Sequence, residues 1–325
     1  MFTLRFDLRA PDFGAPAGAL YAAAVEMAAW GESQGCLAAL ASEHHGSPDG
    51  YLPSPLLLAS AIAARTHTLP IQVAALLVPL YDPVALAEQM AVLDLLSGGR
   101  VSYICAIGYR PEEYAMFGRE MRGRGRRLEL CIDALRRAWS GEAFEFEGRP
   151  VRVTPTPLQP GGPLLLMGGN SEAAVRRAAR LGMGMITQGG EAGLEAVYRE
   201  ACRASGREPG PFLNPPAGTV TSAFVAEDPD RAWQQLGPHL LHDARMYAQW
   251  LGGSVSTSKS VAESADALRA EHGAYRIFTP DEAIAHVRAH GPLLMQPLCG
   301  GLPPELAWES LELLAAKVLP ALRAG

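Results

Sequence analysis

Lysine is scarce in this chain. Only Lys259 and Lys317 occur among its 325 residues. An aldolase of the Schiff-base type needs a lysine amine at its active site. We expect Lys259 in an inserted segment and Lys317 in the last helix, away from the strand ends where such chemistry takes place. The sequence therefore disfavours Schiff-base chemistry.

The chain also has fewer basic than acidic residues, and its formal net charge at pH 7 is −6. Proteins that bind nucleic acid usually carry a basic patch, and here only residues 119–127 gather arginines. Glu120 and Glu129 lie within or beside that cluster. We interpret it as the solvated start of a helix, with anion binding as the alternative, and we expect no nucleic-acid partner.

Cysteines are few, odd in number and without close pairs: Cys36, Cys105, Cys131, Cys202 and Cys299. Zinc sites use close pairs, and secreted disulfide scaffolds are much denser in cysteine. The pattern favours a reducing compartment. No His-Glu-x-x-His run occurs, so we expect no metal ion. His239, His242 and Asp243 fall on an expected outer helix, where solvated polar groups are usual.

Long hydrophobic runs are absent as well. No uncharged apolar stretch reaches the roughly 18 residues that a membrane span needs. The chain enters an alternating strand pattern at Met1-Phe2-Thr3-Leu4-Arg5, with no signal segment ahead of it. We therefore expect a soluble cytoplasmic protein with no membrane partner.

What the chain has instead is a regular alternation of apolar strands and helical patterns. Its residues are 48% hydrophobic, enough for a large core. Strands are expected at residues 2–8, 36–42, 71–80, 101–108, 164–167, 183–187, 219–225 and 293–298, each followed by a helical pattern. This order predicts parallel strands joined by crossover helices. We predict a single α/β domain over residues 1–325, a (β/α)8 TIM barrel, with an inserted, mobile segment at 252–273.

The apolar run that ends at Ser42 is followed directly by Glu43, His44 and His45. In a barrel, functional groups lie at the carboxyl ends of the strands. Histidine has an unperturbed pKa of about 6.5 and so exchanges a proton near neutral pH. The two histidines are therefore candidates for proton transfer, and packing or capping is the plainer interpretation.

Gly168, Gly169, Asn170 and Ser171 join the fifth expected strand to a helix. Backbone N–H groups at a helix N-terminus favour an anion such as a phosphate, and Ser171 is suited to cap that helix. Every helix of a barrel needs a cap, so a purely structural interpretation stays open. The other candidates at strand ends are Asp7, Tyr81, Asp82, Cys105, Gly108, Tyr109, Gln188 and Cys299 to Gly301.

Several segments in this order closely resemble one family over nearly the whole chain. They are Glu43 to His45, Ser54 to Leu56, Leu93 to Arg100, Gly108 to Tyr114 with Phe117-Gly118, and Pro303 to Ala307. The family is that of the bacterial luciferase-like monooxygenases, whose members are (β/α)8 barrels. Several long matches in the same order are far more specific than any single motif.

The resemblance implies reduced FMN, supplied by a separate flavin reductase, with molecular oxygen as the co-substrate. Some relatives use a deazaflavin coenzyme instead and transfer hydride without oxygen. The residue that matches His44 is the family's usual active-site base or proton donor. Glu43 would then orient the loop, and His45 would be structural.

The resemblance also implies the residues that touch the flavin. Ala74 and Ala75 match a non-proline cis peptide beside the flavin ring, and Cys105 matches a thiol near it, although a buried cysteine in a strand is usually inert. Gly108 and Tyr109 belong to the same strand end. Gly168, Gly169, Asn170 and Ser171 would hold the phosphate.

One position departs from the family pattern. Many members have Gly-Arg-Gly-Tyr where this chain has Ala106-Ile107-Gly108-Tyr109. The absent arginine pairs with the flavin phosphate, and a hydrogen bond to a charged group contributes about 1.5–3 kcal/mol. We therefore expect weaker or altered cofactor binding, with more of the phosphate held at Asn170 and Ser171.

We predict a two-component flavin-dependent monooxygenase that acts on a small organic substrate and forms a homodimer, as many relatives do. Two alternatives stay open: a deazaflavin-dependent dehydrogenase or reductase, and a non-enzymatic flavin-binding barrel. Leu76, Tyr81, Ile107, Tyr247 and Trp250 would line a pocket for a weakly polar molecule, although aliphatic residues facing the barrel are usually core.

Overall fold

The computed structural model describes residues 1–189, 192–216, 218–251 and 260–323, which form two compact units. Unit 1 comprises Met1–Pro53 and Pro216–Gly325, and unit 2 comprises Ser54–Pro215. Both are built from parallel strands with helices between them, so the predicted α/β class is confirmed. The single-domain organisation stays a prediction.

Five parallel strands of unit 1 pair in the order β11-β10-β12-β1-β2. Their bounds are β1 (Phe2–Phe6), β2 (Ala39–Ala41), β10 (Ser222–Val225), β11 (Tyr275–Phe278) and β12 (Leu293–Met295). In the register, Phe6 pairs with Ala41 and Leu4 with Met295. The residues that follow β1, β2 and β12 therefore emerge at one edge of the sheet.

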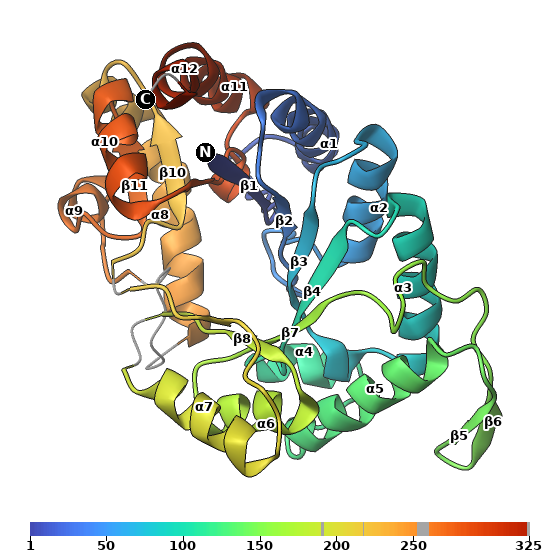
Figure 1. Cartoon of the computed structure of the whole chain (residues 1–325). Coiled ribbons are helices and arrows are strands. Elements are labelled where there is room, and N and C mark those ends of the chain that lie inside the picture. The colour runs from blue at the N-terminus through green and yellow to red at the C-terminus, as the bar shows by residue number, and fades with distance from the viewer. Residues whose placement is uncertain (190–191, 217, 252–259, 324–325) are drawn as a thin grey trace. The chain divides into compact units, whose positions relative to one another are not determined.

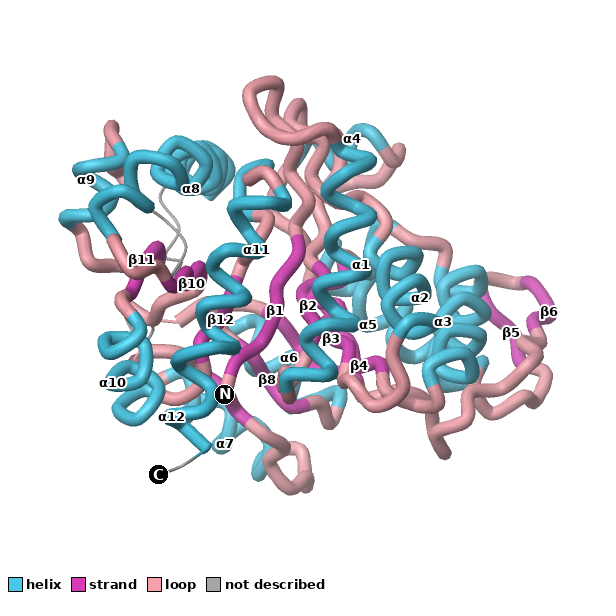
Figure 2. Tube along the Cα trace, turned by 90° about the horizontal axis from the view of Figure 1, so that it is seen from above, coloured by secondary structure: helices cyan, strands magenta, loops and turns pink. Residues whose placement is uncertain are grey.

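Helices of unit 1 cover this sheet. They are α1 (Ala17–Gln34), α8 (Pro229–Leu251), α9 (Ala265–Ala270), α10 (Pro280–His290), η2 (Cys299–Gly301), α11 (Pro304–Leu313), the π-helical turn η3 (Leu314–Val318) and α12 (Leu319–Arg323). Figure 2 shows α1 and α11 running alongside β1. The side chain of Arg323 donates to the carbonyl of Gln34 at 2.7 Å, which fixes the end of α12 to the end of α1.

Five parallel strands of unit 2 pair in the order β3-β4-β7-β8-β9. They are β3 (Ile71–Leu76), β4 (Val101–Cys105), β7 (Leu165–Gly168), β8 (Gly184–Ile186) and β9 (Phe212–Leu213). Leu76 pairs with Cys105, and Cys105 with Met167. The carboxyl ends of β3, β4 and β7 therefore lie side by side.

Helices of unit 2 are α2 (Pro55–Arg65), η1 (Val78–Leu80), α3 (Pro83–Ser97), α4 (Pro111–Met116), α5 (Arg124–Ala138), α6 (Glu172–Leu181) and α7 (Leu194–Ala204). Asp82 caps α3 through the N–H groups of Val84 and Ala85. The antiparallel pair β5 (Phe144–Phe146) and β6 (Arg149–Val151) forms the expected excursion after α5. In Figure 1 this hairpin stands beside α5, and α2, α3, α5, α6 and α7 line the outer side of the strands.

Two strands were missed from the sequence. β9 has only two residues, and β11 directly follows the expected insertion 252–273 and pairs with β10. Residues 252–259 of that insertion lie outside the described residues. The rest of it contains α9, which packs against α8 and β11. In the part of the chain that the structure describes, no helix is both long enough and apolar enough to cross a membrane.

Candidate functional site

His44 lies just beyond the end of β2 and is buried among aromatic rings. Its ring meets Tyr51 edge-on at 4.9 Å between centroids and lies 4.6 Å from the ring of Trp250. Its backbone N–H donates to the carbonyl of Leu52 at 3.2 Å. Both the backbone and the ring of His44 are therefore held in one orientation.

Glu43 forms a hydrogen bond with His45, the second histidine of the loop. Its Oε1 lies 2.9 Å from His45 Nε2, and both side chains are buried. This contact gives His45 a structural partner and lets Glu43 hold the loop through it. The interpretation of His45 as structural agrees with this geometry.

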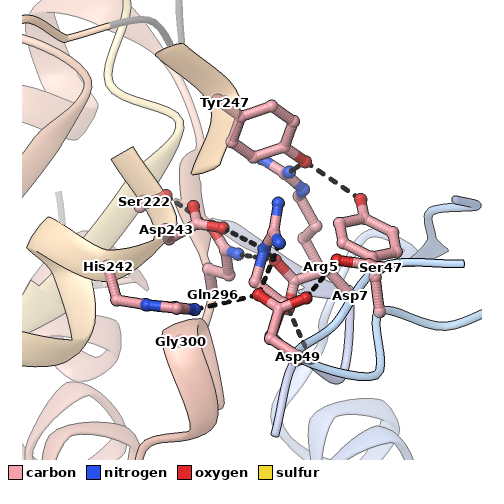
Figure 3. Close-up of polar contacts among 12 residues, drawn as sticks. Arg5, Asp7, Ser47, Asp49, Ser222, His242, Asp243, Tyr247, Gln296 and Gly300 are labelled. Atoms are coloured by element: carbon pink, nitrogen blue, oxygen red, sulfur yellow. Dashed lines mark hydrogen bonds and ion pairs between the residues drawn. The ribbon is translucent and has the colours of Figure 1, made fainter. Parts of the chain in front are cut away.

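Arg9, just after β1, is the centre of a buried ionic network in unit 1, and Figure 3 labels its partners Asp7, Asp49 and Asp243. Its Nε lies 2.7 Å from Asp243 Oδ1 on α8, and its Nη1 lies 2.7 Å from Asp49 Oδ2. Asp7 Oδ2 is 3.7 Å from the same Nε. All four side chains are buried, so Arg9 attracts the carboxyl groups away from water.

Further hydrogen bonds extend the network to three more elements. Tyr275 on β11 donates to Asp243 Oδ2 at 2.9 Å, and Gln296, just after β12, donates to Asp7 Oδ2 at 2.7 Å. The hydroxyl of Ser222 donates to Gln296 Oε1. The carboxyl groups of Asp243 and Asp7 are thereby held by neutral donors as well as by Arg9.

Aromatic side chains enclose the guanidinium group of Arg9. Its Cζ lies 4.4 Å from the ring centroid of Trp250, 4.6 Å from that of Tyr51 and 5.1 Å from that of Tyr247. We call these three residues the aromatic cluster. The hydroxyl groups of Tyr51 and Tyr247 are 2.9 Å apart. Arg5 Nη2 donates to the Tyr247 hydroxyl at 2.6 Å (Figure 3).

The carboxyl groups of the network differ in their affinity for protons. Burial, reinforced by the charge of Asp243, raises the pKa of Asp7 to about 7. Burial alone would also raise the pKa of Asp49, but hydrogen bonds from His242, Arg9 and Ser47 outweigh it and lower that pKa well below its usual range. Asp7 therefore takes up a proton near neutral pH while Asp49 stays ionised.

The expectation that His239, His242 and Asp243 lie on a solvated helix face is wrong. Asp243 is fully buried, His239 Nδ1 is 2.8 Å from the carbonyl oxygen of Gly300, and His242 Nε2 is 2.9 Å from Asp49 Oδ2. His239, Asp243 and Tyr247 recur at intervals of four, which places them on one face of α8. That spacing is the signal that would have found this inward face.

In unit 2, the candidate residues gather at the carboxyl ends of β3 and β4. The Ala74–Ala75 peptide is cis, as the resemblance implied. Cys105 ends β4 fully buried, and burial raises the pKa of its thiol to about 12. Cys105 is therefore an uncharged thiol at neutral pH. Gly108 and Tyr109 follow Cys105 in the loop after β4.

The loop from Gly168 to Ser171 leads from β7 into α6. Ser171 caps the helix, since its Oγ accepts from the N–H of Ala174 at 3.3 Å. Gly169 has φ +155°, and a Cβ there would lie 2.8 Å from the Cβ of Ala174. Asn170 Oδ1 is buried without a hydrogen-bond partner among the described residues. An unpaired amide oxygen beside a capped helix start fits a polar ligand at this loop.

Ile107 occupies the position where many family members have an arginine. Its loop is fixed by contacts with Tyr114. The Tyr114 hydroxyl donates to the carbonyl of Ile107, and the Tyr114 ring packs against Leu77 and Leu80. The loop is therefore fixed by its backbone, and the Ile107 side chain brings no charge to it.

Neither a metal cluster nor a catalytic lysine emerges from the residues that the structure describes. No group of three or more His, Cys, Asp or Glu side chains in those residues could hold a metal ion. Lys317 pairs with Glu227, and both are exposed. Lys259 lies outside the described residues.

Comparison with curated proteins gives partial matches. An uncharacterised Mycobacterium tuberculosis protein is 35% identical over 129 residues, which cover 38% of this chain and 44% of that protein. The FMNH2-dependent dimethylsulfone monooxygenase of Pseudomonas putida is 32% identical over 140 residues, 41% of this chain and 38% of that enzyme. These two matches span less than half of either relative. The F420-dependent glucose-6-phosphate dehydrogenase of Amycolatopsis mediterranei is 26% identical over 85% of this chain and 86% of its own.

Solved structures match nearly the whole chain. The monooxygenase RslO1 from Streptomyces bottropensis has a TM-score of 0.78 at 23% identity, covering 98% of this chain and 99% of its own. The oxygenating constituent of 3,6-diketocamphane monooxygenase from Pseudomonas putida, solved with FMN, has a TM-score of 0.72 at 19% identity, covering 98% and 97%. The family description "luciferase-like monooxygenase" matches residues 6–290. The chain belongs to the luciferase-like monooxygenase family.

Proposed function

We propose that this chain is the oxygenating component of a two-component flavin monooxygenase, which uses reduced FMN and molecular oxygen on a small organic substrate. The observation that carries the flavin part is the edge formed by β3, β4 and β7 in unit 2. There Ala74 and Ala75, the Cys105–Tyr109 loop and the Gly168–Ser171 loop lie on adjacent strand ends. Ligands of α/β proteins bind at such carboxyl ends.

The Gly168–Ser171 loop would hold the flavin phosphate. The N-terminus of α6 offers backbone N–H groups and a positive dipole end. The half-buried side chain of Asn170 would supply a further donor when its Nδ2 faces the phosphate. The one acidic residue of the first turn, Glu172, pairs with Arg176 at 3.3 Å, which offsets its repulsion of an anion.

Ala74, Ala75, Gly108 and Tyr109 would flank the flavin ring. Cys105 would contact the ring as a neutral thiol, because its raised pKa of about 12 disfavours a thiolate nucleophile. Reduced FMN, when bound, supplies the two electrons that let one oxygen atom of O2 enter the substrate while the other leaves as water.

His44 would move the proton in this reaction, as acid or base. Its imidazole is held between Tyr51 and Trp250, which excludes most water from it. Glu43 would act indirectly, since its contact with His45 keeps the loop in place. General acid–base groups of this kind contribute about 10²–10⁴-fold to rate.

A deazaflavin-dependent dehydrogenase or reductase is the second candidate. One observation favours it: the F420-dependent glucose-6-phosphate dehydrogenase matches over 85% of this chain, a longer stretch than the FMNH2-dependent monooxygenase does. The two reactions differ in their use of oxygen, which makes them separable by experiment.

The test is an anaerobic titration of the purified protein with reduced FMN and, separately, with F420. We expect reduced FMN to bind at micromolar concentration and F420 to bind at least about tenfold more weakly, a difference of about 1.4 kcal/mol. Oxygen uptake should then follow when a flavin reductase and substrate are added. Preference for F420 without oxygen uptake would favour the dehydrogenase, and binding of neither would favour a non-enzymatic barrel.

The partners follow from this chemistry. A separate flavin reductase would supply the reduced cofactor, and the chain would work in the cytoplasm as a homodimer. The five cysteines are buried and free, which suits a reducing compartment.

A further inference from the structure

The hydroxyl group of Tyr247, on α8, accepts a hydrogen bond from β1. Arg5 Nη2 donates to it at 2.6 Å (Figure 3). Arginine has donors only, so the oxygen of Tyr247 is the acceptor, and its own hydrogen stays available for a further bond. The hydroxyl oxygen of Tyr51 lies 2.9 Å away, within reach of that hydrogen. A hydrogen-bonded chain therefore runs from Arg5 through Tyr247 to Tyr51.

Burial keeps both hydroxyl groups of this chain neutral. The side chains of Tyr51 and Tyr247 are buried. Their burial raises the pKa of Tyr247 and raises the pKa of Tyr51 well above its usual range. A hydrogen bond from a charged donor is stronger than one between neutral groups, so Arg5 anchors the chain at its β1 end.

Tyr247 also contacts a second ring of the aromatic cluster. Its ring centroid lies 5.8 Å from that of Trp250, and the two planes meet at 78°. Edge-to-face contacts of this kind stabilise beyond the area that they bury. Tyr247 therefore holds Tyr51 through its hydroxyl group and Trp250 through its ring.

The two rings that Tyr247 holds are the same two that contact His44. The imidazole lies 4.9 Å from the ring of Tyr51 at 78°, and 4.6 Å from the ring of Trp250 at 54°. The N–H of His44 donates to the carbonyl of Leu52, which fixes the backbone, whereas the groups packed around a side chain select its torsions. The plane of the imidazole thus depends on two rings that Tyr247 keeps in place.

We propose that Tyr247 is a positioning residue for proton transfer by His44. The proposal rests on the proposed function, because it concerns the step that is there assigned to His44. Tyr247 acts through Tyr51 and Trp250, and the imidazole itself exchanges the proton. Proton transfer needs a donor and an acceptor within about 2.6–3.2 Å, so a rotated imidazole lowers the rate while flavin and substrate still bind.

The first test is Tyr247→Phe, which keeps the ring against Trp250 and removes the hydroxyl group from the chain. We expect kcat to fall about tenfold, with KM and the dissociation constant of reduced FMN changed less than about twofold. Tyr51→Phe breaks the same hydrogen bond and should lower kcat to a similar extent. The double variant should be no slower than Tyr247→Phe alone, and additive losses would overturn the shared chain.

The second test removes the imidazole. In a His44→Ala background, Tyr247→Phe should cost no further rate, because no imidazole is left to orient. A further loss of about tenfold would show that Tyr247 acts on flavin or substrate directly and would overturn the proposal. Tyr198→Phe is the matched control, because Tyr198 is a buried tyrosine of unit 2 whose hydroxyl donates to the carbonyl of Met183 at 2.9 Å. It should leave kcat unchanged.

The third test is an NMR measurement that needs neither flavin nor turnover. The chain has eight histidines, and after ¹⁵N labelling of histidine the imidazole signals of His44 are those that His44→Ala lacks. We expect Tyr247→Phe and Tyr51→Phe to shift these signals, because the magnetic field of a neighbouring ring depends on its orientation. Tyr198→Phe should leave them in place.

Unchanged His44 signals in Tyr247→Phe and Tyr51→Phe would refute the proposal, whatever the flavin titration gives. If Tyr247→Phe does not fold, Tyr51→Phe decides, since it breaks the same hydrogen bond. An inactive protein with shifted His44 signals would refute the proposed function, and with it the step that Tyr247 serves, although the contact holds. The two failures are therefore distinguishable.

Discussion

Arg9 Nε and Asp243 Oδ1 lie 2.7 Å apart although 234 residues separate them in the chain, and both side chains are fully buried. The pair joins the end of β1 to the middle of α8, so the first strand and a helix from the last third of the chain share one ionic core. Because Asp49 also pairs with Arg9, removal of Arg9 or of either of its two closest carboxylates leaves a buried charge without its partner.

Asp243→Ala should destabilise the fold by about 3–5 kcal/mol, since it removes one of the two carboxylates that lie 2.7 Å from Arg9 and the carboxylate that accepts from Tyr275. Chemical denaturation followed by circular dichroism measures the loss. The control is Arg269→Ala, which removes an ion pair between exposed side chains of the same unit and should cost less than about 1 kcal/mol. Equal effects of the two substitutions would contradict a central role for Asp243.

Asp7→Asn should change how stability depends on pH. The pKa of Asp7 is raised by burial to about 7 in the folded protein and is about 4 when the chain is unfolded, so the folded state binds more protons between these values. Its contribution is therefore fully present below about pH 4 and is lost as the pH rises through about 7. Asparagine stays neutral and can still accept from Gln296.

Thermal or urea unfolding of both proteins at several pH values tests this sign. Relative to the unaltered protein, Asp7→Asn should gain about 2–3 kcal/mol between about pH 5 and about pH 8. All other titrating groups are common to the two proteins, so their difference isolates Asp7. Parallel pH profiles would show that Asp7 is not protonated in the folded state.

The fold was largely predictable because its signals are local. Apolar runs such as that of β3 and start signals such as Thr279-Pro280-Asp281-Glu282, which forms a capping box on α10, lie within a few residues of one another. β11 was missed because Tyr275–Phe278 is short and directly follows the expected insertion 252–273. β9 has two residues, too few for any period to be visible.

The candidate site was less predictable because its contacts are distant in sequence. The sequence suggested His44 and the Gly168–Ser171 loop, each a compact motif at a strand end. Arg9 drew no attention, since a lone arginine after a strand is usually exposed. Its burial depends on Asp49 and Asp243, which come from elements that only folding brings together.

Gly169→Ala should lower the affinity for reduced FMN while the protein still folds. The new Cβ would lie 2.8 Å from Ala174 Cβ, so the loop before α6 must shift by several tenths of an ångström. A displaced loop no longer directs its N–H groups at the phosphate. We expect the dissociation constant for reduced FMN to rise about tenfold, a loss of about 1.4 kcal/mol of binding free energy. Fluorescence or absorbance titration under anaerobic conditions measures it.

Gly18→Ala is the matched glycine control. Gly18 lies in α1 with nothing within 4 Å of the added Cβ, so the substitution should leave flavin binding unchanged. It should stabilise the protein by about 0.5–1 kcal/mol, because alanine loses less backbone entropy in a helix. Equal affinity of the Gly169→Ala and Gly18→Ala proteins for reduced FMN would show that the α6 loop does not hold the flavin phosphate.

His44→Ala should fold normally, bind reduced FMN as before and lose about 10²–10⁴-fold in turnover, the contribution of a general acid–base group. The cavity left between Tyr51 and Trp250 is bounded by aromatic rings, so added imidazole should enter it and restore part of the rate. His286→Ala, on α10 and 5.0 Å from the ring of Phe278, is a histidine control that should keep full turnover. Rescue by imidazole distinguishes lost proton transfer from lost packing, because a packing defect alone would respond equally to benzene. Full activity of His44→Ala, or equal rescue by imidazole and benzene, would show that His44 has a structural role. Another group would then transfer the proton.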